Sequence, residues 1–179
     1  MEHKKLVKAC QRKDRSAQKE LYELYHEQMF RLCYRYLDNI HDAEDIVVEG
    51  FIKIYDKINT VDYRNETSFI NWMKTIMINE SLMFLRRNKR IRFFEDDLII
   101  EQESLVEKSM ELDEILKAIS CMPTGYRTIF NMYVIEGFSH KEIAEKLGIS
   151  LQTSKSQLSR AKKFLQKLIK DLNYERRAI

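Results

Sequence analysis

The stretch Lys141–Lys163, KEIAEKLGISLQTSKSQLSRAKK, has the pattern of two short helices joined by a sharp turn. Ile143, Ala144 and Leu147 recur at the spacing of one helix face, and the alanine is small where a second helix must cross closely. Gly148 follows them, and glycine adopts the positive φ of such a turn without strain. The pattern therefore predicts a helix-turn-helix.

The residues around this turn supply helix caps and a polar helix start. Ser139 and Glu142, in SHKE, have the spacing of a capping box, and Ser150 is placed to cap the second helix. That helix would present its first side chains to base edges in the major groove, where Gln152 can bond adenine. The full set of predicted contacts to bases or phosphates is Gln152, Thr153, Lys155, Ser156, Ser159, Arg160 and Lys162. An ordinary helical hairpin also often has a glycine at its bend, but the coincidence of all these features favours DNA binding.

The composition of the 179-residue chain predicts an all-α fold. It contains only four glycines and one proline, and strand-rich folds need such residues at their hairpins. No apolar run reaches the length of a membrane span, and the basic N-terminus lacks the apolar core of a secretion signal. Cys10, Cys33 and Cys121 are widely spaced and show no zinc-ligand pairing, which is typical of a reducing compartment. We therefore expect a cytoplasmic protein without membrane insertion.

Three amphipathic segments in the first half of the chain predict one helical core. Apolar residues recur at helical spacing over residues 17–37. We expect Asp42 to open the next helix and Thr67 or Ser68 to cap the third. The predicted core residues of the second and third helices are Ile46, Val47, Phe51, Ile54, Ile58, Phe69, Trp72, Met73, Ile76, Met77 and Met83.

Charge and periodicity divide the chain into two small helical domains. Basic clusters occupy residues 86–92 and 155–177, and the acidic run EDDLIIEQE lies between them at residues 95–103. Two separate basic clusters suggest two surfaces for a polyanion, although solvated helix faces would carry the same residues. Apolar periodicity is lost between the clusters. The predicted boundaries are residues 1–92 for the first domain, 93–110 for an acidic linker, and 111–179 for the helix-turn-helix domain.

Two segments of the chain resemble the extracytoplasmic-function (ECF) sigma factors, the small two-domain initiation subunits of bacterial RNA polymerase. Residues 112–168, with SHKEIAEKLGIS near their centre, are similar to region 4 of that family. DAEDIVVEGFIKIY followed by SFINWMKTIMINESLMFLRRNKR is similar to its region 2. The resemblance implies that the first domain docks on core RNA polymerase and opens the promoter. It also implies that the second domain reads the −35 element in double-stranded DNA.

The resemblance implies roles for particular side chains. The helix that binds the clamp helices of the polymerase matches DAEDIVVEGF, with Asp42, Asp45 and Glu49 as its polar candidates. For Asp42, compensation of the helix dipole explains the acid equally well. Trp72 lies on the core stripe, so we expect it to pack and not to stack on a base. The candidates for contact with the −10 element and its single strand are Tyr63, Arg64, Asn65, Asn71, Lys74, Asn79, Arg86 and Arg87.

Three residues depart from the family's pattern. Ser154 stands where an apolar residue usually packs the recognition helix, and Gln157 replaces a common basic residue. We therefore expect modest −35 affinity or a loosely seated helix. Glu80 would repel DNA unless its carboxylate faces elsewhere.

Two other functions are open alternatives. One is a conventional regulator that binds an operator as a dimer, and the other is a protein-interaction module without DNA binding. The clamp-like acidic helix and the basic third helix favour the sigma factor, because an operator-binding dimer needs neither. The scattered histidines and the lack of a phosphate-binding glycine loop predict no catalysis, metal, cofactor or small-molecule substrate, and His140 is expected at the surface. The resemblance also implies control by an anti-sigma factor.

Overall fold

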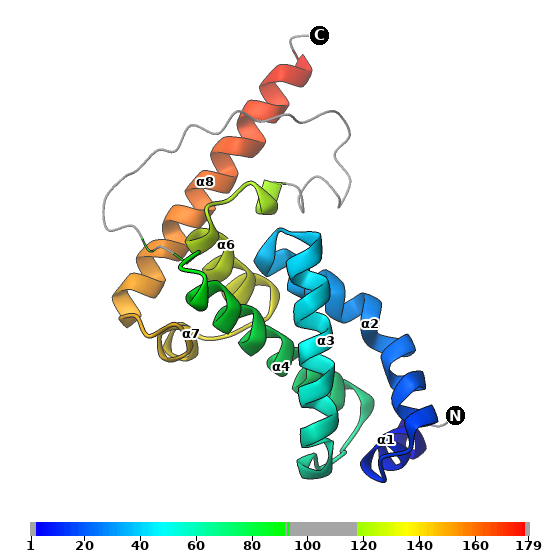
Figure 1. The fold of residues 1–179 in the computed structure, drawn as a ribbon. Coiled ribbons are helices and arrows are strands. Elements are labelled where there is room, and N and C mark those ends of the chain that lie inside the picture. Colours follow the sequence, from blue (N-terminus) through cyan, green and yellow to red (C-terminus); the bar gives the residue numbers. More distant parts are fainter. Residues whose placement is uncertain (1–2, 92, 94–117, 178–179) are drawn as a thin grey trace. The chain divides into compact units, whose positions relative to one another are not determined.

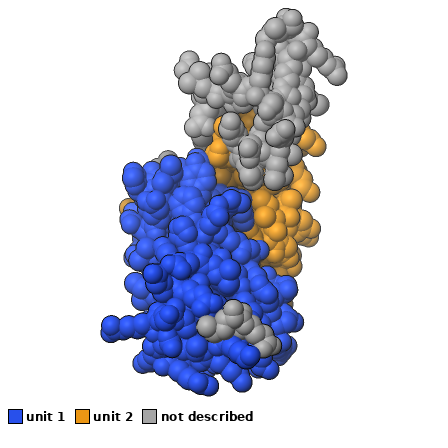
Figure 2. Space-filling view, turned by 90° about the vertical axis from the view of Figure 1, so that its right-hand side faces the viewer, with its two compact units in different colours: residues 1–88 blue, residues 89–179 orange. Residues whose placement is uncertain are grey.

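The computed structural model of the protein describes residues 3–91, 93 and 118–177. The chain forms two compact units, residues 1–88 (the front unit) and residues 89–179 (the C-terminal unit), as Figures 1 and 2 show. Every regular element within the described residues is helical, which confirms the predicted all-α fold. The predicted acidic linker lies outside the described residues except for Phe93, so its boundaries stay a prediction.

Three long helices build the front unit, and each packs against the other two. Of the apolar residues that recur over residues 17–37, Leu24 is 57% exposed. The predicted core of the second and third helices is buried, apart from Trp72, which is half-buried, and Met83, which is 37% exposed. The prediction for Met83 was wrong because the buried face at this end of the helix runs through Leu82 and Leu85. The elements are α2 (Arg15–Leu37), α3 (Ile40–Lys57), the 3₁₀ turn η1 (Ile58–Thr60) and α4 (Glu66–Arg87).

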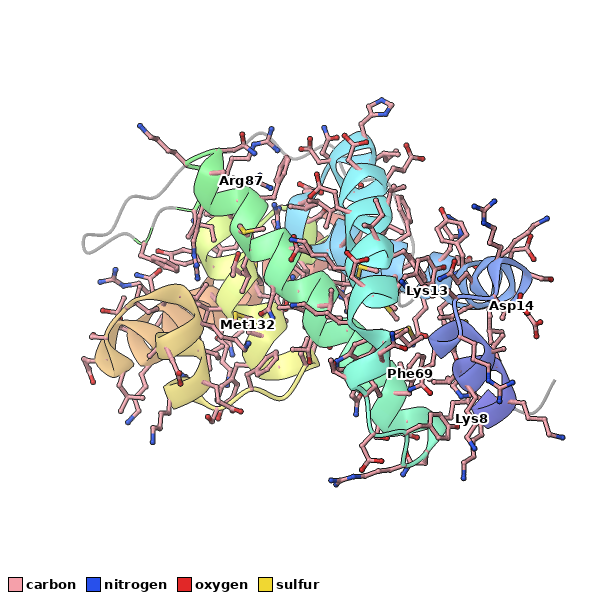
Figure 3. All side chains as sticks on the ribbon, turned by 60° about the horizontal axis from the view of Figure 1, so that its bottom comes forward. Lys8, Lys13, Asp14, Phe69, Arg87 and Met132 are labelled. Atoms are coloured by element: carbon pink, nitrogen blue, oxygen red, sulfur yellow. The ribbon has the colours of Figure 1, made fainter. Side chains whose placement is uncertain are left out.

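A short helix precedes these three and was not predicted. This helix, α1 (His3–Gln11), packs on α2 and places Leu6, Val7 and Cys10 in the core at 2% exposure or less. Lys8, on the same helix, is exposed (Figure 3). A helix this short is marginal by itself, so tertiary packing stabilises it and its sequence signal is weak.

The caps of α3 and α4 lie two or three residues before the predicted ones, which were Asp42 for α3 and Thr67 or Ser68 for α4. Asn39 caps α3, and its side chain accepts from the Asp42 N–H at 3.0 Å. Asn65 caps α4 and accepts from the Ser68 N–H at 2.8 Å. Asp42 and Ser68 do not cap these helices, because they occupy the third helical position, whose N–H is the group that a cap binds.

The C-terminal unit is arranged around one long helix. Both shorter helices pack against it, and its core contains Ile129, Met132, Ile143 and Ala161, each fully buried; Met132 is labelled in Figure 3. The elements are α6 (Thr124–Phe130), the π-helical turn η2 (Asn131–Ile135), α7 (His140–Leu147) and α8 (Leu151–Arg177).

Candidate nucleic-acid interface

The turn between α7 and α8 has the predicted helix-turn-helix geometry. Ser139 and Glu142 form a reciprocal capping box: the Glu142 N–H donates to Ser139 Oγ at 3.3 Å, and the Ser139 N–H donates to Glu142 Oε2 at 2.8 Å. The hydroxyl and N–H of Ser139 hold the pKa of Glu142 below its ordinary value. Gly148 ends α7 with φ of 68° and ψ of 35°, the left-handed conformation expected of it.

The first turn of α8 is closed by its own hydroxyl groups. Ser150 Oγ accepts from the Thr153 N–H at 2.9 Å, as predicted for the cap, and lies 2.8 Å from Thr153 Oγ1. Ser156 donates its hydroxyl to the Thr153 carbonyl at 3.0 Å. Two of the predicted DNA contacts, Thr153 and Ser156, are thus half-buried and bonded within the helix start.

The remaining predicted contacts on α8 form one outward row. Gln152, Lys155, Ser159 and Lys162 are exposed at successive spacings of three, four and three residues, which places them on one helix face. Arg160 is half-buried. The opposite face is buried through Ser154, Gln157, Leu158 and Ala161. α8 therefore presents a polar, cationic face to solvent and seats itself through the other.

The Ser154 departure is compensated by His140. Ser154 is fully buried, and its Oγ lies 2.9 Å from Nδ1 of His140, the first residue of α7. The imidazole stacks on Tyr133 with ring centroids 4.4 Å apart. Burial, and then the nearby charges of Lys155 and Lys162, lower the pKa of His140. His140, expected at the surface, is half-buried, and its bond to Ser154 also links α7 to α8.

Gln157 and Glu80 also face inward. Gln157 is 1% exposed, so it seats α8 and does not stand in the place of a phosphate contact. Glu80 is 6% exposed and forms an ion pair with Lys53 between α4 and α3. Its carboxylate therefore faces elsewhere than solvent, and it adds no repulsion to a DNA-facing surface.

The exposed side of α4 carries most of the predicted −10 contacts. Asn71, Asn79 and Arg86 are exposed at intervals that keep them on one side of the helix, and Lys74 beside them is half-buried. Arg87 is exposed, and its guanidinium lies 3.9 Å from the Glu49 carboxylate of α3. Trp72 packs on Phe69 with ring centroids 5.5 Å apart, in agreement with the packing role expected for it.

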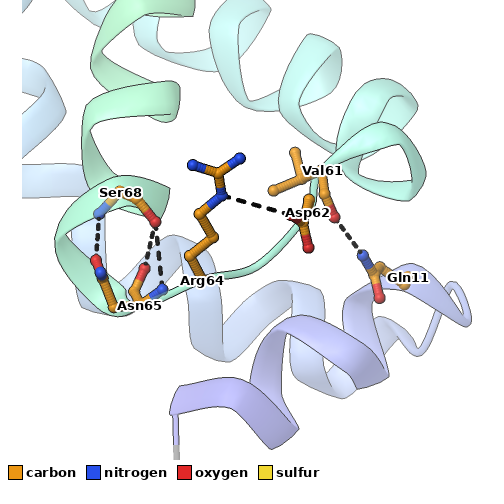
Figure 4. A network of polar contacts seen from close by, with 6 residues as sticks. All are labelled: Gln11, Val61, Asp62, Arg64, Asn65 and Ser68. Atoms are coloured by element: carbon orange, nitrogen blue, oxygen red, sulfur yellow. Dashed lines mark hydrogen bonds and ion pairs between the residues drawn. The ribbon is translucent and has the colours of Figure 1, made fainter.

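The loop before α4 holds the other three −10 candidates in different states, and Figure 4 shows two of them, Arg64 and Asn65. Tyr63 is half-buried, and its hydroxyl lies 2.9 Å from His3 Nδ1. Arg64 is exposed, and its Nε lies 3.5 Å from Asp62. The side-chain oxygen of Asn65 accepts from the Ser68 N–H and so caps α4.

The outward face of α3 mixes acidic and apolar side chains. Asp45 and Glu49 are exposed, while Asp42 is half-buried near the start of the helix. Val48 is 50% exposed and Ile52 is 56% exposed on the same helix, and the sequence analysis missed both. The available signal was an apolar pair four residues apart that lies outside the buried stripe of α3.

Other kinds of site find little support in the part of the chain that the structure describes. There, no group of three or more His, Cys, Asp or Glu residues is arranged to hold a metal ion. Among the described helices, none combines the length and apolar character needed to cross a membrane. Cys10 and Cys33 are buried free thiols, and desolvation raises the pKa of Cys10 to about 11 and that of Cys33 to about 12. These two cysteines stay protonated and pack as small apolar residues.

A helix-turn-helix behind a separate helical unit defines a DNA-binding transcription protein with two regions. Residues 21–91 match the family described as Sigma-70 region 2, and residues 112–165 match Sigma-70, region 4. The chain is 28% identical to the ECF RNA polymerase sigma factor SigW of Bacillus subtilis, over 94% of this chain and 97% of that protein. It is 30% identical to RNA polymerase sigma factor SigV of the same organism, over 79% and 84% of the two chains.

Solved structures share this fold. The sigma factor RpoE of Bartonella quintana, crystallised with the anti-sigma factor NepR, aligns with a TM-score of 0.53 and 24% identity over 85% of this chain and 96% of that one. CnrH, solved with the cytosolic domain of CnrY, aligns with a TM-score of 0.51 and 19% identity over 93% and 96%.

The chain belongs to the ECF sigma factors. It is a two-domain sigma factor that directs promoter-specific transcription, as the resemblance implied. The alternative of a dimeric operator-binding regulator is not favoured, since region 2 has no place in such a protein.

Proposed function

We propose that the front unit binds core RNA polymerase and opens the −10 element, while the first turns of α8 read the −35 element in duplex DNA. The observation that carries the second part is the row of Gln152, Lys155, Ser159 and Lys162, exposed on a capped helix whose other face is buried. A helix seated in this way can enter the major groove without rearrangement.

The side chains of α8 have different proposed roles, because some of them are already hydrogen-bonded within the helix. The Gln152 amide can donate and accept toward adenine, and Lys155, Arg160 and Lys162 neutralise phosphates. The Ser156 hydroxyl donates to the Thr153 carbonyl, so in this rotamer it can only accept, for example from a base amino group. Thr153 shares its hydroxyl with the Ser150 cap and contributes mainly to the seating of the helix.

The surface of α4 and the loop before it are proposed to hold the separated −10 strand. Asn71, Asn79 and Arg86 form the exposed stripe, and Lys74 and Arg87 flank it. In the loop, Arg64 is exposed for phosphate or base contact, and the Asn65 amide group keeps its two N–H donors. Tyr63 would present its ring to an extruded base, because stacking offsets part of the cost of unpairing.

The face of α3 is proposed to dock on the polymerase. Asp45 and Glu49 give it negative charge, and Val48 and Ile52 add exposed apolar area beside them. Such a mixed surface fits a partner helix that carries basic and apolar side chains. Asp42 lies at the edge of this face and is half-buried.

Further parts of the proposal concern regulation and location. The structural neighbour RpoE was crystallised with the anti-sigma factor NepR, and we propose that a protein of this kind also covers DNA-facing surfaces of this chain. The protein acts in the cytoplasm, where the polymerase supplies the chemistry and the sigma factor supplies none. Residues 93–110 serve as the acidic tether between the two domains.

Run-off transcription tests the proposal. The purified chain is added to core polymerase, and transcripts are measured from promoters of the chain's own genome. We expect specific transcripts, and we expect Lys155→Ala to lower the slope of log affinity against log salt by about 1 for −35 duplex binding by the holoenzyme. Lys167→Ala, on an exposed residue about three turns further along α8, is the matched control. Operator binding without polymerase binding would contradict the proposal.

A further inference from the structure

The loop that joins α3 to α4 is held at its beginning by the last residue of α1. Gln11 Nε2 donates to the Ile58 carbonyl at 3.0 Å and to the Val61 carbonyl at 3.4 Å. Figure 4 shows Gln11 at the end of α1, reaching the chain where η1 gives way to the loop of residues 61–65. One amide group thus ties two carbonyls at the start of the loop to α1, and the Ile58 carbonyl also accepts from the Val61 N–H at 3.3 Å.

The same loop is held at its middle residue, Tyr63, by the first residue of α1. His3 Nδ1 lies 2.9 Å from the Tyr63 hydroxyl, and the two rings stack with centroids 5.5 Å apart. His3 Nε2 is bonded to the Tyr25 hydroxyl, which in turn donates to Glu66 Oε1 at 3.2 Å. His3 therefore links the loop to α2 and to the first residue of α4.

α1 is rigid enough to act as a support. Its residues Leu6, Val7 and Cys10 are buried against the front unit, and its two ends are eight residues, or about 12 Å, apart. Gln11 and His3 project toward the loop, whereas Lys8 between them is exposed. The loop is thus bound at two points by one packed helix, while Arg64 stays exposed.

We propose that α1 pre-forms the loop of residues 61–65 for capture of an unpaired −10 base, with His3 and Gln11 as positioning residues. The inference rests on the function proposed for the loop. A loop without regular structure loses conformational entropy when it binds, and a support that has already ordered it removes that cost from the binding step. α1 would then set how strictly the captured base is chosen, because a looser loop accommodates wrong bases at lower cost.

The structural half of the proposal is tested on the full chain without polymerase, by hydrogen exchange. Gln11→Met keeps the side-chain stem but loses both N–H donors, and His3→Phe keeps the stacked ring but loses both nitrogens. We expect either change to speed exchange of the 61–65 segment several-fold and to leave α2 and α3 unchanged. Lys8→Ala is the matched control on the same helix. Unchanged exchange in the 61–65 segment of both variants would overturn the proposal.

The functional half is tested with holoenzyme on promoters that carry single substitutions in the −10 element. The wild type defines a ratio of opening rates between the best and the substituted promoter, and we expect Gln11→Met to compress that ratio about fivefold, as loss of one hydrogen bond would. If either α1 variant fails to fold, Tyr63→Phe takes its place. This change removes only the hydroxyl that meets His3, and it should compress the ratio of opening rates in the same direction. If α1 merely stabilised the fold, its variants would lower the unfolding temperature but leave the ratio of opening rates unchanged, and that result would overturn the inference. Failure of the wild type to open any promoter would instead contradict the proposed function, and with it the role of α1 in base capture.

Discussion

Each unit anchors the helix proposed to face DNA through one buried polar link, and the two links differ in charge. In the front unit, Glu80 of α4 is 6% exposed and is paired with Lys53 of α3. In the C-terminal unit, Ser154 of α8 is fully buried and is bonded to His140 of α7, whose pKa is lowered. The ionic link is vulnerable to the loss of one partner, because a buried charge is left behind. The neutral link is vulnerable to protonation of its imidazole.

The largest effect is expected from breaking the ionic link on one side. Lys53→Met leaves the Glu80 carboxylate buried without its cation and should lower the free energy of unfolding of the front unit by about 2 kcal/mol, less than for a fully buried pair. The expected loss of unfolding free energy is smaller than for a fully buried pair because the side chain of Lys53 is 37% exposed. Denaturant unfolding followed by Trp72 fluorescence measures it, since this is the only tryptophan of the chain and lies in α4.

The reciprocal double variant distinguishes a buried charge from lost packing. Lys53→Met combined with Glu80→Met should recover most of the lost stability, because a hydrophobic pair of similar volume replaces the ions. Lys57→Ala, at an exposed position of α3, serves as the control and should change little. A double variant no more stable than Lys53→Met would mean that the charge of Glu80 is not the cause.

A smaller effect is expected from breaking the neutral link. Ser154→Ala removes the hydroxyl that meets His140 and should lower the stability of the C-terminal unit by about 1 kcal/mol, the usual net worth of a neutral hydrogen bond. Hydrogen exchange of α7 and the first turns of α8 reports the loss, with Gln166→Ala as an exposed control. Protection equal to that of the wild type would show that the hydrogen bond does not hold the two helices.

The neutral link between His140 and Ser154 should also respond to pH. The unfolded chain binds a proton at His140 more readily than the folded chain does, because folding lowers the pKa below the ordinary value of 6.5. This contribution is therefore fully present above pH 6.5 and is lost as the pH falls through the folded pKa. The unfolding temperature of the C-terminal unit should therefore fall on mild acidification. His140→Phe should remove this component, and an identical pH profile in that variant would contradict it.

The smallest expected effect is a change in the pKa of His140 when a neighbouring charge is removed. Lys155 and Lys162 lower the pKa of His140, after burial. Lys155→Ala removes one of these charges, so the pKa of His140 should rise toward its ordinary value. NMR titration of the imidazole measures the change, and Lys167→Ala should leave it in place. A titration midpoint that does not move would show that the charge of Lys155 does not contribute to the lowered pKa of His140.

The comparison of predicted and observed caps shows how far local patterns reach. The capping box at Ser139 and the positive φ of Gly148 were predicted correctly, because both depend on residues within one turn. The predicted cap lay three residues late at α3 and two or three residues late at α4. Asn39 and Asn65 were passed over since a cap and its third helical residue are both polar, and only the backbone geometry tells them apart.

The sequence by itself determined the all-α fold and the helix-turn-helix. These features follow from apolar periodicity and from glycine and serine at fixed offsets, so they are readable along the chain. Only the tertiary structure decided the roles of His140, Glu80 and α1. Each of these depends on contacts across 14 to 60 residues of sequence, as in His140 with Ser154 and His3 with Tyr63. No local pattern specifies such contacts, because they arise when separate helices pack.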